Sequence, residues 1–351
     1  MNIGVMSAWN TNSGVAMHAE PVFRELIRMG HKVTVFSFVK NDFHGECMTA
    51  GDEPYVIRCF GTRTHTAVLD PRPFLETDMD ILVVEDLGML PVEKMANIWP
   101  VLKKKMKLVH VVHENRMCEH SWFYKLDWDK VVYFDHRQDF LKSVYPDAEY
   151  VPFPCFPVRS GSKKEARAKL GLPQKKKIIY SFGHRGYHSY YRELPPRLRR
   201  DCILLNLIET DYQMLEELTP TKWRMVRKSD AISTAEFDDY LFASDAAIFH
   251  KFRSRQHAVV SSTVFQALGT GCPIFVPSQS DFFHSWKKEV VHYRDITALN
   301  KKLIEVLRDK KKQKALKTAA EAFAEKHSPR VIAGKFFDIF EKVLGENREK
   351  K

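Results

Sequence analysis

Short apolar runs of strand length recur along the chain, and segments of helix length separate them. The clearest in the first half are Ile3–Met6, Asp80–Glu85, Leu108–Val112 and Lys130–Phe134. Because these runs are largely apolar instead of alternating with polar residues, they are typical of parallel strands buried on both faces. Strands of this kind that alternate with helices predict an α/β fold built on parallel sheets.

The first 38 residues predict one strand–loop–helix–strand unit. A polar loop, Ser7–Ala16, precedes an amphipathic helix over Ala16–Met29, whose apolar residues recur at helical spacing. Gly30 is predicted to cap the end of that helix, and His31–Phe38 is the next strand. The size and order of the unit indicate a βαβ crossover, so the first half is predicted to be a Rossmann-like domain.

Three prolines within Tyr150–Arg159 predict an interdomain linker, because neither a helix nor a central strand tolerates them. The strand pattern then restarts. Its runs are Lys177–Gly183, Cys202–Ile208, Trp223–Val226, Ala246–His250 and Pro273–Val276. The second half is therefore predicted to be a second Rossmann-like domain.

The lysine-rich tail is predicted to be helical over Asn300–Ala324 and Pro329–Leu344, with proline at the first position of the last helix. We therefore expect a first domain over residues 1–155, a second over 156–327 and a C-terminal helix over 328–351. No short-period repeat or low-complexity tract interrupts this order.

The chain has 55 lysines and arginines against 44 aspartates and glutamates, a formal net charge of +11. Much of the excess lies in lysine runs at 103–105, 175–177 and 310–312. Such runs are most often solvated helix ends and loops, while anionic ligands and an acidic membrane surface stay open as partners. No aromatic residues that stack on bases are interleaved with these runs, so we expect no nucleic-acid partner.

No apolar stretch reaches the roughly 18 residues of a membrane-spanning helix, and the first residues lack the regions of a secretion signal. Six scattered cysteines without a Cys-x-x-Cys pair favour a reducing compartment over a disulfide framework or a zinc ribbon. We therefore expect a cytoplasmic protein, with contact to a membrane surface left open.

The stretch "VVSSTVFQALGTGCPIF", residues 259–275, places Ser261, Ser262 and Thr263 at the predicted start of a helix. Ligands of open parallel sheets bind beyond the carboxyl ends of the strands, where helix N-termini favour anions. The cations of the preceding loop are Lys251, Arg253 and Arg255. Hydroxyls and cations together predict a phosphate or diphosphate site; the alternative is a plain Ser/Thr cap. Gln266 is expected either to bind a ribose hydroxyl or to make an internal hydrogen bond.

His113 follows the strand Leu108–Val112 at its carboxyl end, so its imidazole is predicted to face a ligand, whereas His110 within the strand is predicted to be packed. A metal site of these two with His120 and Cys118 is disfavoured, because "HENRMCEH" lacks the His-Glu-x-x-His spacing. The Asp-x-Asp triplets at 78–80 and 127–129 precede strands and are predicted to be loop residues at the opposite edge. We predict no metal site.

Four longer stretches carry a family resemblance: "NSGVAMHAEPVFRELIRMGHKVTVFSF", "YLFASDAAIFHK", "TVFQALGTGCPIFV" and "HSPRVIAGKFFDIFEKVL". In this order they resemble the GT-B glycosyltransferases of the group 1, retaining type, over nearly the whole chain. The resemblance implies two Rossmann-like domains that face each other across a cleft, with the last helix crossing back to the first domain. It also implies an acceptor-side first domain and a second domain that binds a nucleotide-sugar.

The resemblance assigns roles to residues of both domains. Ser13 and Gly14 match a loop that approaches the donor phosphates and the acceptor, and His113 matches a histidine that faces the donor sugar. Ser261–Thr263 match the diphosphate-binding turn, and Gln266 stands where the family has a glutamate that contacts ribose.

A further part of the donor site is implied after the strand that ends near residue 182. Gly183, His184 and Arg185 fall where the family has a glycine and a phosphate-binding arginine. Arg192 is the nearest match for the lysine that follows in the family.

One departure from the family leaves alternatives open. The family motif has two glutamates eight positions apart, and this chain has Ala258 and Gln266 at those positions. Gln266 keeps hydrogen-bonding groups, whereas the Ala258 side chain has none. A catalytically inactive nucleotide-sugar-binding partner subunit and a GT-B-like sugar-nucleotide epimerase are therefore alternatives to transfer.

The function that we expect is transfer of a hexosyl group from a nucleotide-diphosphate sugar to an acceptor hydroxyl. Arg185, Lys251 and the helix at Ser261 would stabilise the departing diphosphate without metal or cofactor, and His113 would orient the sugar. The resemblance implies retention of configuration. The acceptor stays open among a glycan, a small molecule and a lipid-linked molecule, the last being suited to lysines 103–105 and 107.

Overall fold

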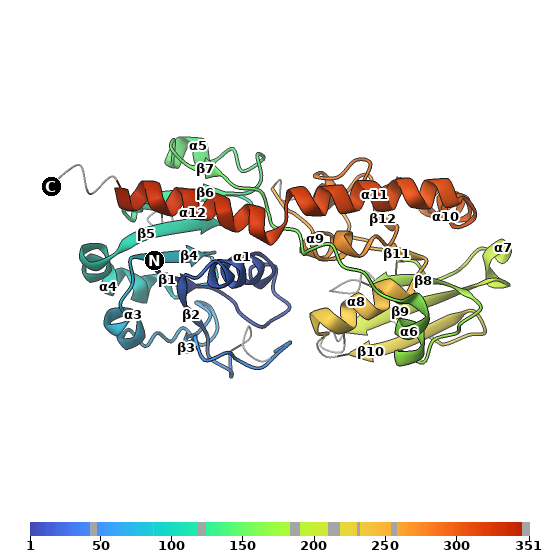
Figure 1. Cartoon of the computed structure of the whole chain (residues 1–351), viewed down its shortest axis with the longest axis horizontal. Coiled ribbons are helices and arrows are strands. Elements are labelled where there is room, and N and C mark those ends of the chain that lie inside the picture. Colours follow the sequence, from blue (N-terminus) through green and yellow to red (C-terminus); the bar gives the residue numbers. More distant parts are fainter. Residues whose placement is uncertain are drawn as a thin grey trace. The chain divides into compact units, whose positions relative to one another are not determined.

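The computed structural model describes residues 1–42, 48–86, 88–117, 124–182, 190–209, 218–229, 232–253 and 258–345. It divides into two compact units. Unit 1 comprises Met1–Pro154, Gln256–Val259 and His327–Lys351, and unit 2 comprises Cys155–Arg255 and Val260–Lys326. Each unit is built on its own parallel sheet with helices packed on it (Figure 1). Within these described ranges, no helix has the length and apolar character needed to cross a membrane.

The sheet of unit 1 has the order β3-β2-β1-β4-β5-β6-β7, and every neighbouring pair is parallel. Its strands are β1 (Asn2–Met6), β2 (Lys32–Phe38), β3 (Val56–Phe60), β4 (Ile81–Glu85), β5 (Lys107–Val112), β6 (Lys130–Tyr133) and β7 (Glu149–Tyr150). The strand order reverses between β1 and β4. The loops that follow these two strands therefore lie at the position where open α/β sheets bind ligands.

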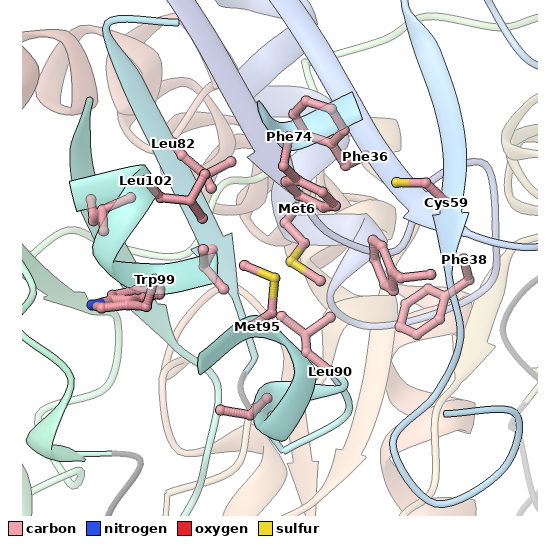
Figure 2. Packing of buried hydrophobic residues seen from close by; sticks show 14 of the residues in the cluster. Met6, Phe36, Phe38, Cys59, Phe74, Leu82, Leu90, Met95, Trp99 and Leu102 are labelled. Carbon is pink, nitrogen blue, oxygen red and sulfur yellow. The ribbon is translucent and has the colours of Figure 1, made fainter. Parts of the chain in front are cut away.

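Helices cover the sheet of unit 1, and they are α1 (Ala16–Arg28), α3 (Arg72–Glu76), α4 (Val92–Lys105), α5 (Leu141–Val144) and α12 (Pro329–Gly345). On one face, Phe36 and Leu82 of the strands pack with Phe74 of α3 and Trp99 of α4 (Figure 2). The last helix, α12, packs against α1 and buries Phe336. The expectation that the C-terminal helix returns to the first domain is thereby confirmed.

The sheet of unit 2 has the order β10-β9-β8-β11-β12-β13, and its neighbouring strands are also parallel. Its strands are β8 (Lys177–Phe182), β9 (Cys202–Glu209), β10 (Arg224–Ser229), β11 (Ala246–Ile248), β12 (Ile274–Pro277) and β13 (Val291–Tyr293). Here the order reverses between β8 and β11. The loops after these strands occupy the equivalent ligand-binding position.

The helices of unit 2 are α6 (Lys163–Lys169), α7 (Pro196–Arg199), α8 (Thr234–Ala243), α9 (Ser262–Ala267), α10 (Ile296–Arg308) and α11 (Lys310–Lys326). The α9 helix continues as a 3-10 turn, Leu268–Thr270, and stops at Gly271, whose φ of 69° suits glycine. A Cβ at Gly269 would lie 2.2 Å from the carbonyl oxygen of Pro157. One glycine therefore ends the helix, and the other lets the chain of the linker pass close by.

The structure confirms the central strands and corrects the expectations at the edges. Gly30, with a φ of 92°, ends α1 as predicted. The strands β3, β7 and β13 were not predicted, because they lie at sheet edges and lack a continuous apolar run. The single tail helix over Asn300–Ala324 is wrong: the structure has α10 and α11. Asp309 separates them, since its carboxylate accepts hydrogen bonds from the amides of Lys311 (2.9 Å) and Lys312 (3.1 Å) and so starts a new helix.

Candidate functional site

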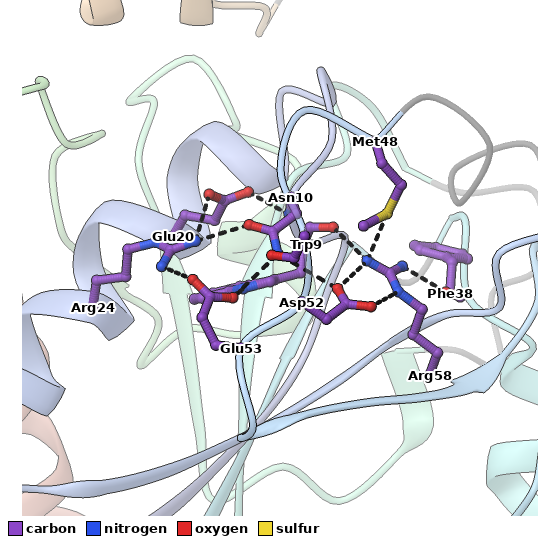
Figure 3. Close-up of polar contacts among 10 residues, drawn as sticks. Trp9, Asn10, Glu20, Arg24, Phe38, Met48, Asp52, Glu53 and Arg58 are labelled. Carbon is purple, nitrogen blue, oxygen red and sulfur yellow. Dashed lines mark hydrogen bonds and ion pairs between the residues drawn. The ribbon is translucent and has the colours of Figure 1, made fainter. Parts of the chain in front are cut away.

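The loop after β1 is held by a polar network drawn from several segments (Figure 3). Asn10 has a φ of 55°, unusual for a residue other than glycine. Its amide group donates to Gly51 O (3.0 Å) and Glu53 (3.1 Å), and its side-chain oxygen accepts from Arg24 (2.9 Å). Its backbone N–H donates to Glu20 (2.7 Å). These bonds fix the backbone that leads to the predicted donor loop.

Arg58 of β3 completes this network from the other side (Figure 3). Its guanidinium forms a bidentate pair with Asp52 (2.7 and 2.8 Å) and donates to the carbonyl oxygens of Phe38 (2.8 Å) and Trp9 (3.2 Å). Because the Arg58 side chain is only 8% exposed, these bonds are poorly replaced by water. An edge strand therefore holds the start of the loop.

Ser13 and Gly14 lie at the entrance of α1. The Ser13 carbonyl accepts a hydrogen bond from Met17 N (3.0 Å), and its hydroxyl accepts one from Val15 N (3.2 Å). Gly14 is exposed. The donor role of these two residues stays a prediction, and their position at the strand-order reversal suits it.

His113 lies in a buried cluster with two residues that the sequence did not single out. Its Nε2 is 3.2 Å from Glu85 Oε2, and Nδ1 of His18 is 3.1 Å from both oxygens of the same carboxylate. Glu85 is the last residue of β4 and is completely buried, and His18 belongs to α1. Phe134 packs against both imidazoles, with ring-centroid distances of 5.6 Å to His18 and 5.0 Å to His113.

The charges in this cluster follow from burial and hydrogen bonding. Burial alone would raise the pKa of Glu85, but the two imidazoles lower it to about 2, so the carboxylate is ionised. Burial would lower the pKa of His113, but the hydrogen bond to Glu85 raises it overall. Burial lowers the pKa of His18, which is therefore neutral. The cluster holds one negative carboxylate with at least one hydrogen-bond donor on each side.

Two further carboxyl groups lie next to His113. Asp86 follows β4 with a φ of 60°, and burial raises its pKa. Burial and the nearby Asp86 raise the pKa of Glu114 to about 7, and its side chain is 9% exposed. Neither Glu114 carboxyl oxygen has a hydrogen-bond partner among the described residues. An unusual φ and unpaired buried oxygens are features of functional sites, and both occur at the carboxyl edge of the sheet.

His110 is packed, as predicted. Its ring stacks on Trp128 at 4.9 Å, its Nδ1–H donates to Val84 O (3.1 Å), and it is completely buried. Burial lowers its pKa to about 4. The ring nitrogen that points toward Glu114 is 3.9 Å from that carboxylate, too far for a hydrogen bond.

His18, Glu85 and His113 are also the described residues whose ligand-type atoms lie close enough to hold a metal ion, all within 4.8 Å of one another. Hydrogen bonds account for the same contacts. His120 and Cys118, weighed with His113 from the sequence, lie outside the described residues.

The two Asp-x-Asp triplets are loop residues at the amino edge, as predicted. Asp80 accepts from Asn2 N (2.6 Å), and Asp129 accepts from Leu108 N (2.8 Å). Asp129 also pairs with Lys103 (2.9 Å) and Lys107 (3.0 Å). These pairs partly neutralise the lysines that were expected to favour contact with an anionic bilayer.

In unit 2, the segment after β12 joins the loop after β11 to the start of α9. The Lys251 ammonium lies 4.6 Å from the ring centroid of Phe282, whose carbonyl accepts a hydrogen bond from Ser261 N (3.1 Å). Ser280, just before Phe282, donates to Phe252 O (3.3 Å). Residues 280–282 therefore contact both the loop that carries Lys251 and the start of α9, and the sequence analysis had not singled out this segment.

The start of α9 is not a plain Ser/Thr cap. No side chain caps the helix, and the Ser261 hydroxyl is buried without a hydrogen-bond partner among the described residues. Within the same ranges, the amides of Ser262 and Thr263 make no backbone hydrogen bond to a carbonyl. Donors left open at a helix N-terminus favour an anion. Gln266 is buried, and its backbone carbonyl accepts from Arg159 (2.8 Å).

The other predicted donor residues are less well placed by the structure. Arg253 is exposed. Arg192 is also exposed, and its backbone carbonyl accepts from Arg224 of β10 (3.0 Å). Gly183, His184, Arg185 and Arg255 lie outside the described residues. The donor roles of all six stay predictions.

A histidine at the end of β11 was also missed. The His250 ring stacks on Tyr190 at 3.4 Å, and its Nδ1 is 2.8 Å from the Tyr293 hydroxyl. Burial lowers the pKa of His250 to about 4, so it is neutral. The only signal in the sequence for His250 was its place at the carboxyl end of a predicted strand, two residues before Phe252.

No known protein-family model matches the chain, but solved structures match over nearly its whole length. A glycosyltransferase from Rickettsia africae is 12% identical, with a TM-score of 0.65 and 98% of each chain covered. Sucrose-phosphate synthase from Thermosynechococcus elongatus is 13% identical, with a TM-score of 0.65, covering 99% of this chain and 100% of that one. Anabaena HepE, solved with UDP-glucose, is 12% identical, with a TM-score of 0.65, covering 97% and 100%. The chain therefore has the GT-B fold, with two Rossmann-like domains on parallel sheets.

Proposed function

We propose that this protein transfers a hexosyl group from a nucleotide-diphosphate sugar to an acceptor hydroxyl. The observation that carries the proposal is the uncapped start of α9 beside Lys251, at the carboxyl edge of the sheet of unit 2. Structures with the same fold include one with bound UDP-glucose, which supports a donor of this class.

The chemistry that these groups supply is electrostatic. As the bond to the sugar breaks, negative charge develops on the leaving diphosphate. The Lys251 ammonium and the open amides of Ser262 and Thr263 are oriented donors. They stabilise the charge that develops in the transition state more strongly than they stabilise the intact donor. We include in the proposal that the transfer needs no metal and retains the anomeric configuration, with His113 orienting the sugar.

The test is a panel of UDP-glucose, UDP-N-acetylglucosamine, GDP-mannose and ADP-glucose, each titrated into the whole chain by calorimetry. Released nucleoside diphosphate is measured with and without candidate acceptors. Lys251→Ala removes the ammonium, and Ser262→Ala removes the side-chain hydroxyl while it keeps the backbone amide. Each variant should weaken binding of the preferred donor about 10- to 100-fold, because a hydrogen bond to a charged group is worth about 1.5–3 kcal/mol.

The matched control is Lys169→Ala, which removes an exposed lysine of unit 2 that pairs with Asp239. It should leave donor binding unchanged. Absence of binding by every donor, or equal binding by the Lys251 and Lys169 variants, would refute the proposal. Conversion of the donor to an isomer without an acceptor would instead indicate an epimerase, and binding without release of diphosphate an inactive partner.

A further inference from the structure

The buried carboxylate of Glu85 receives two imidazole nitrogens. Both contacts, 3.1 Å from His18 Nδ1 and 3.2 Å from His113 Nε2, have hydrogen-bond length. An ionised carboxylate only accepts hydrogen bonds. The proton must therefore lie on Nδ1 of His18 and on Nε2 of His113.

The other ring nitrogens then differ in their surroundings. Nε2 of His18 is buried and has no partner in the described part of the chain. No described residue hydrogen-bonds to Nδ1 of His113, and the His113 side chain keeps 8% exposure. His18 is therefore closed off inside the unit, whereas His113 presents one ring nitrogen at the carboxyl edge of the sheet, where ligands bind.

We propose that Glu85 is a positioning residue for His113. It accepts the Nε2–H of His113, fixes the imidazole in the orientation that presents Nδ1 to a ligand, and is itself held by His18. The ligand part of this inference rests on the proposed function, and the orientation and protonation of His113 do not.

A metal ion between the same three residues is the competing interpretation. A metal-bound histidine almost always donates its other ring N–H to an acceptor. If His18 bound a metal through Nδ1, its Nε2 would carry a proton that is buried without an acceptor among the described residues, which is costly. Hydrogen bonding to Glu85 leaves only a bare nitrogen there, so the hydrogen-bonded arrangement is favoured.

The protonation of His113 is also set by its other neighbours. The titratable groups around it in the described residues are His18 of α1, Glu85 and Asp86 at the end of β4, and His110 and Glu114 of β5 and its end. The aromatic neighbour Phe134 is uncharged. Glu85 is the carboxylate in direct contact, and its hydrogen bond is the largest influence that raises the pKa of His113.

The test uses the whole chain labelled with ¹⁵N-histidine and long-range ¹H–¹⁵N spectra from pH 6 to 9, without any donor. The His113 signals are those that disappear in His113→Gln. In the unsubstituted chain Nε2 should stay protonated throughout, while Nδ1 loses its proton as the pH rises. A His113 that is protonated on Nδ1 and bare on Nε2 at high pH would overturn the proposal, whether or not any variant folds.

Glu85→Gln tests whether the charge of the Glu85 carboxylate raises the pKa of His113. It keeps an acceptor but removes the charge, and it should lower the pKa of His113 by about 1 to 3 pH units. The matched control is Glu149→Gln, which removes a half-exposed carboxylate of unit 1 that pairs with Lys130. A His113 titration that Glu85→Gln leaves unchanged, in a variant with the circular dichroism of the parent chain, would overturn the proposal.

Incubation with zinc sulfate alone, followed by dialysis and elemental analysis, distinguishes a metal site from the hydrogen-bonded arrangement. The expected result is no retained zinc. One zinc per chain that is lost in Glu85→Gln would establish a metal site in place of the positioning contact.

If the donor panel identifies a substrate, Glu85→Gln should lower kcat about 10- to 100-fold with little change in KM for the donor. Because the spectra need no donor, failure of the donor panel leaves this inference intact.

Discussion

The two units place the polar groups at their strand ends in different ways. In unit 1, partners distant in sequence close the site: Glu85 bonds to His18, 67 residues away, and Arg24 to Glu53, 29 residues away. In unit 2, Ser262 is half-buried and Arg253 exposed, and the Ser261 hydroxyl has no partner among the described residues. Unit 1 therefore fixes the orientation and protonation of its groups in advance, whereas unit 2 leaves hydrogen-bonding groups without a partner among the described residues, as our proposal of an anionic ligand requires.

The largest effect should come from breaking the network of unit 1. Arg58→Ala leaves Asp52 and two backbone carbonyls without their donor, and we expect a loss of about 3 kcal/mol in the free energy of unfolding. The measurement is urea denaturation followed by fluorescence. The control Arg72→Ala removes an exposed pair with Asp70 and should have no measurable effect. Equal losses in the two variants would mean that the strand ends of unit 1 are not held by this network.

A smaller effect should come from the buried histidine of unit 2. Burial lowers the pKa of His250 from 6.5 to about 4, so it stabilises the fold fully above pH 6.5 and progressively less as the pH falls toward 4. Between pH 7 and pH 5 this histidine should reduce the unfolding free energy by about 2 kcal/mol. His250→Phe should remove that part of the pH dependence, measured by urea denaturation at both pH values.

The control for this prediction is His284→Phe, which replaces an exposed histidine of the same unit. It should leave the pH dependence of the parent chain in place. If His250→Phe behaves like this control, the buried groups at the strand ends of unit 2 do not contribute to acid sensitivity. Only the buried polar groups of unit 1 would then be shown to affect stability.

The smallest effect concerns two serines at helix starts in unit 2. Ser233 caps α8 by accepting from Glu236 N (3.2 Å), whereas Ser261 makes no such bond at α9. Ser233→Ala should cost about 1 kcal/mol of unfolding free energy, and Ser261→Ala should cost about 0.5 kcal/mol or less. Thermal denaturation without ligand measures the loss of stability in each of the two variants. A larger loss for Ser261→Ala would show that its hydroxyl already has a structural role.

The sequence predicted the fold well where the signal is local. Continuous apolar runs identified the central strands, because a parallel strand covered on both faces has few polar positions. Edge strands such as β3 were missed, since one side of an edge strand is not paired and its residues are more polar. The sequence analysis included Asp309 in one long helix, although an aspartate directly before a lysine run can also cap a helix.

The candidate site divides in the same way. The hydroxyls at Ser261–Thr263 and the cation Lys251 could be located from sequence, because strand ends and helix starts are set by neighbouring residues. The roles of Glu85 and His18 could not, because nothing local distinguishes a buried glutamate that ends an apolar strand from a solvated one.

By itself, the sequence determined the two parallel sheets, the linker and the positions of the strand ends, since periodicity and backbone chemistry act over a few residues. Only the tertiary structure decided which polar groups meet. Glu85, His18 and His113 come from β4, α1 and the end of β5, and they form one buried hydrogen-bonded group only after the sheet has assembled. Burial then sets their protonation, because an isolated charge inside a protein is costly and is stable only beside a hydrogen-bonding or oppositely charged partner.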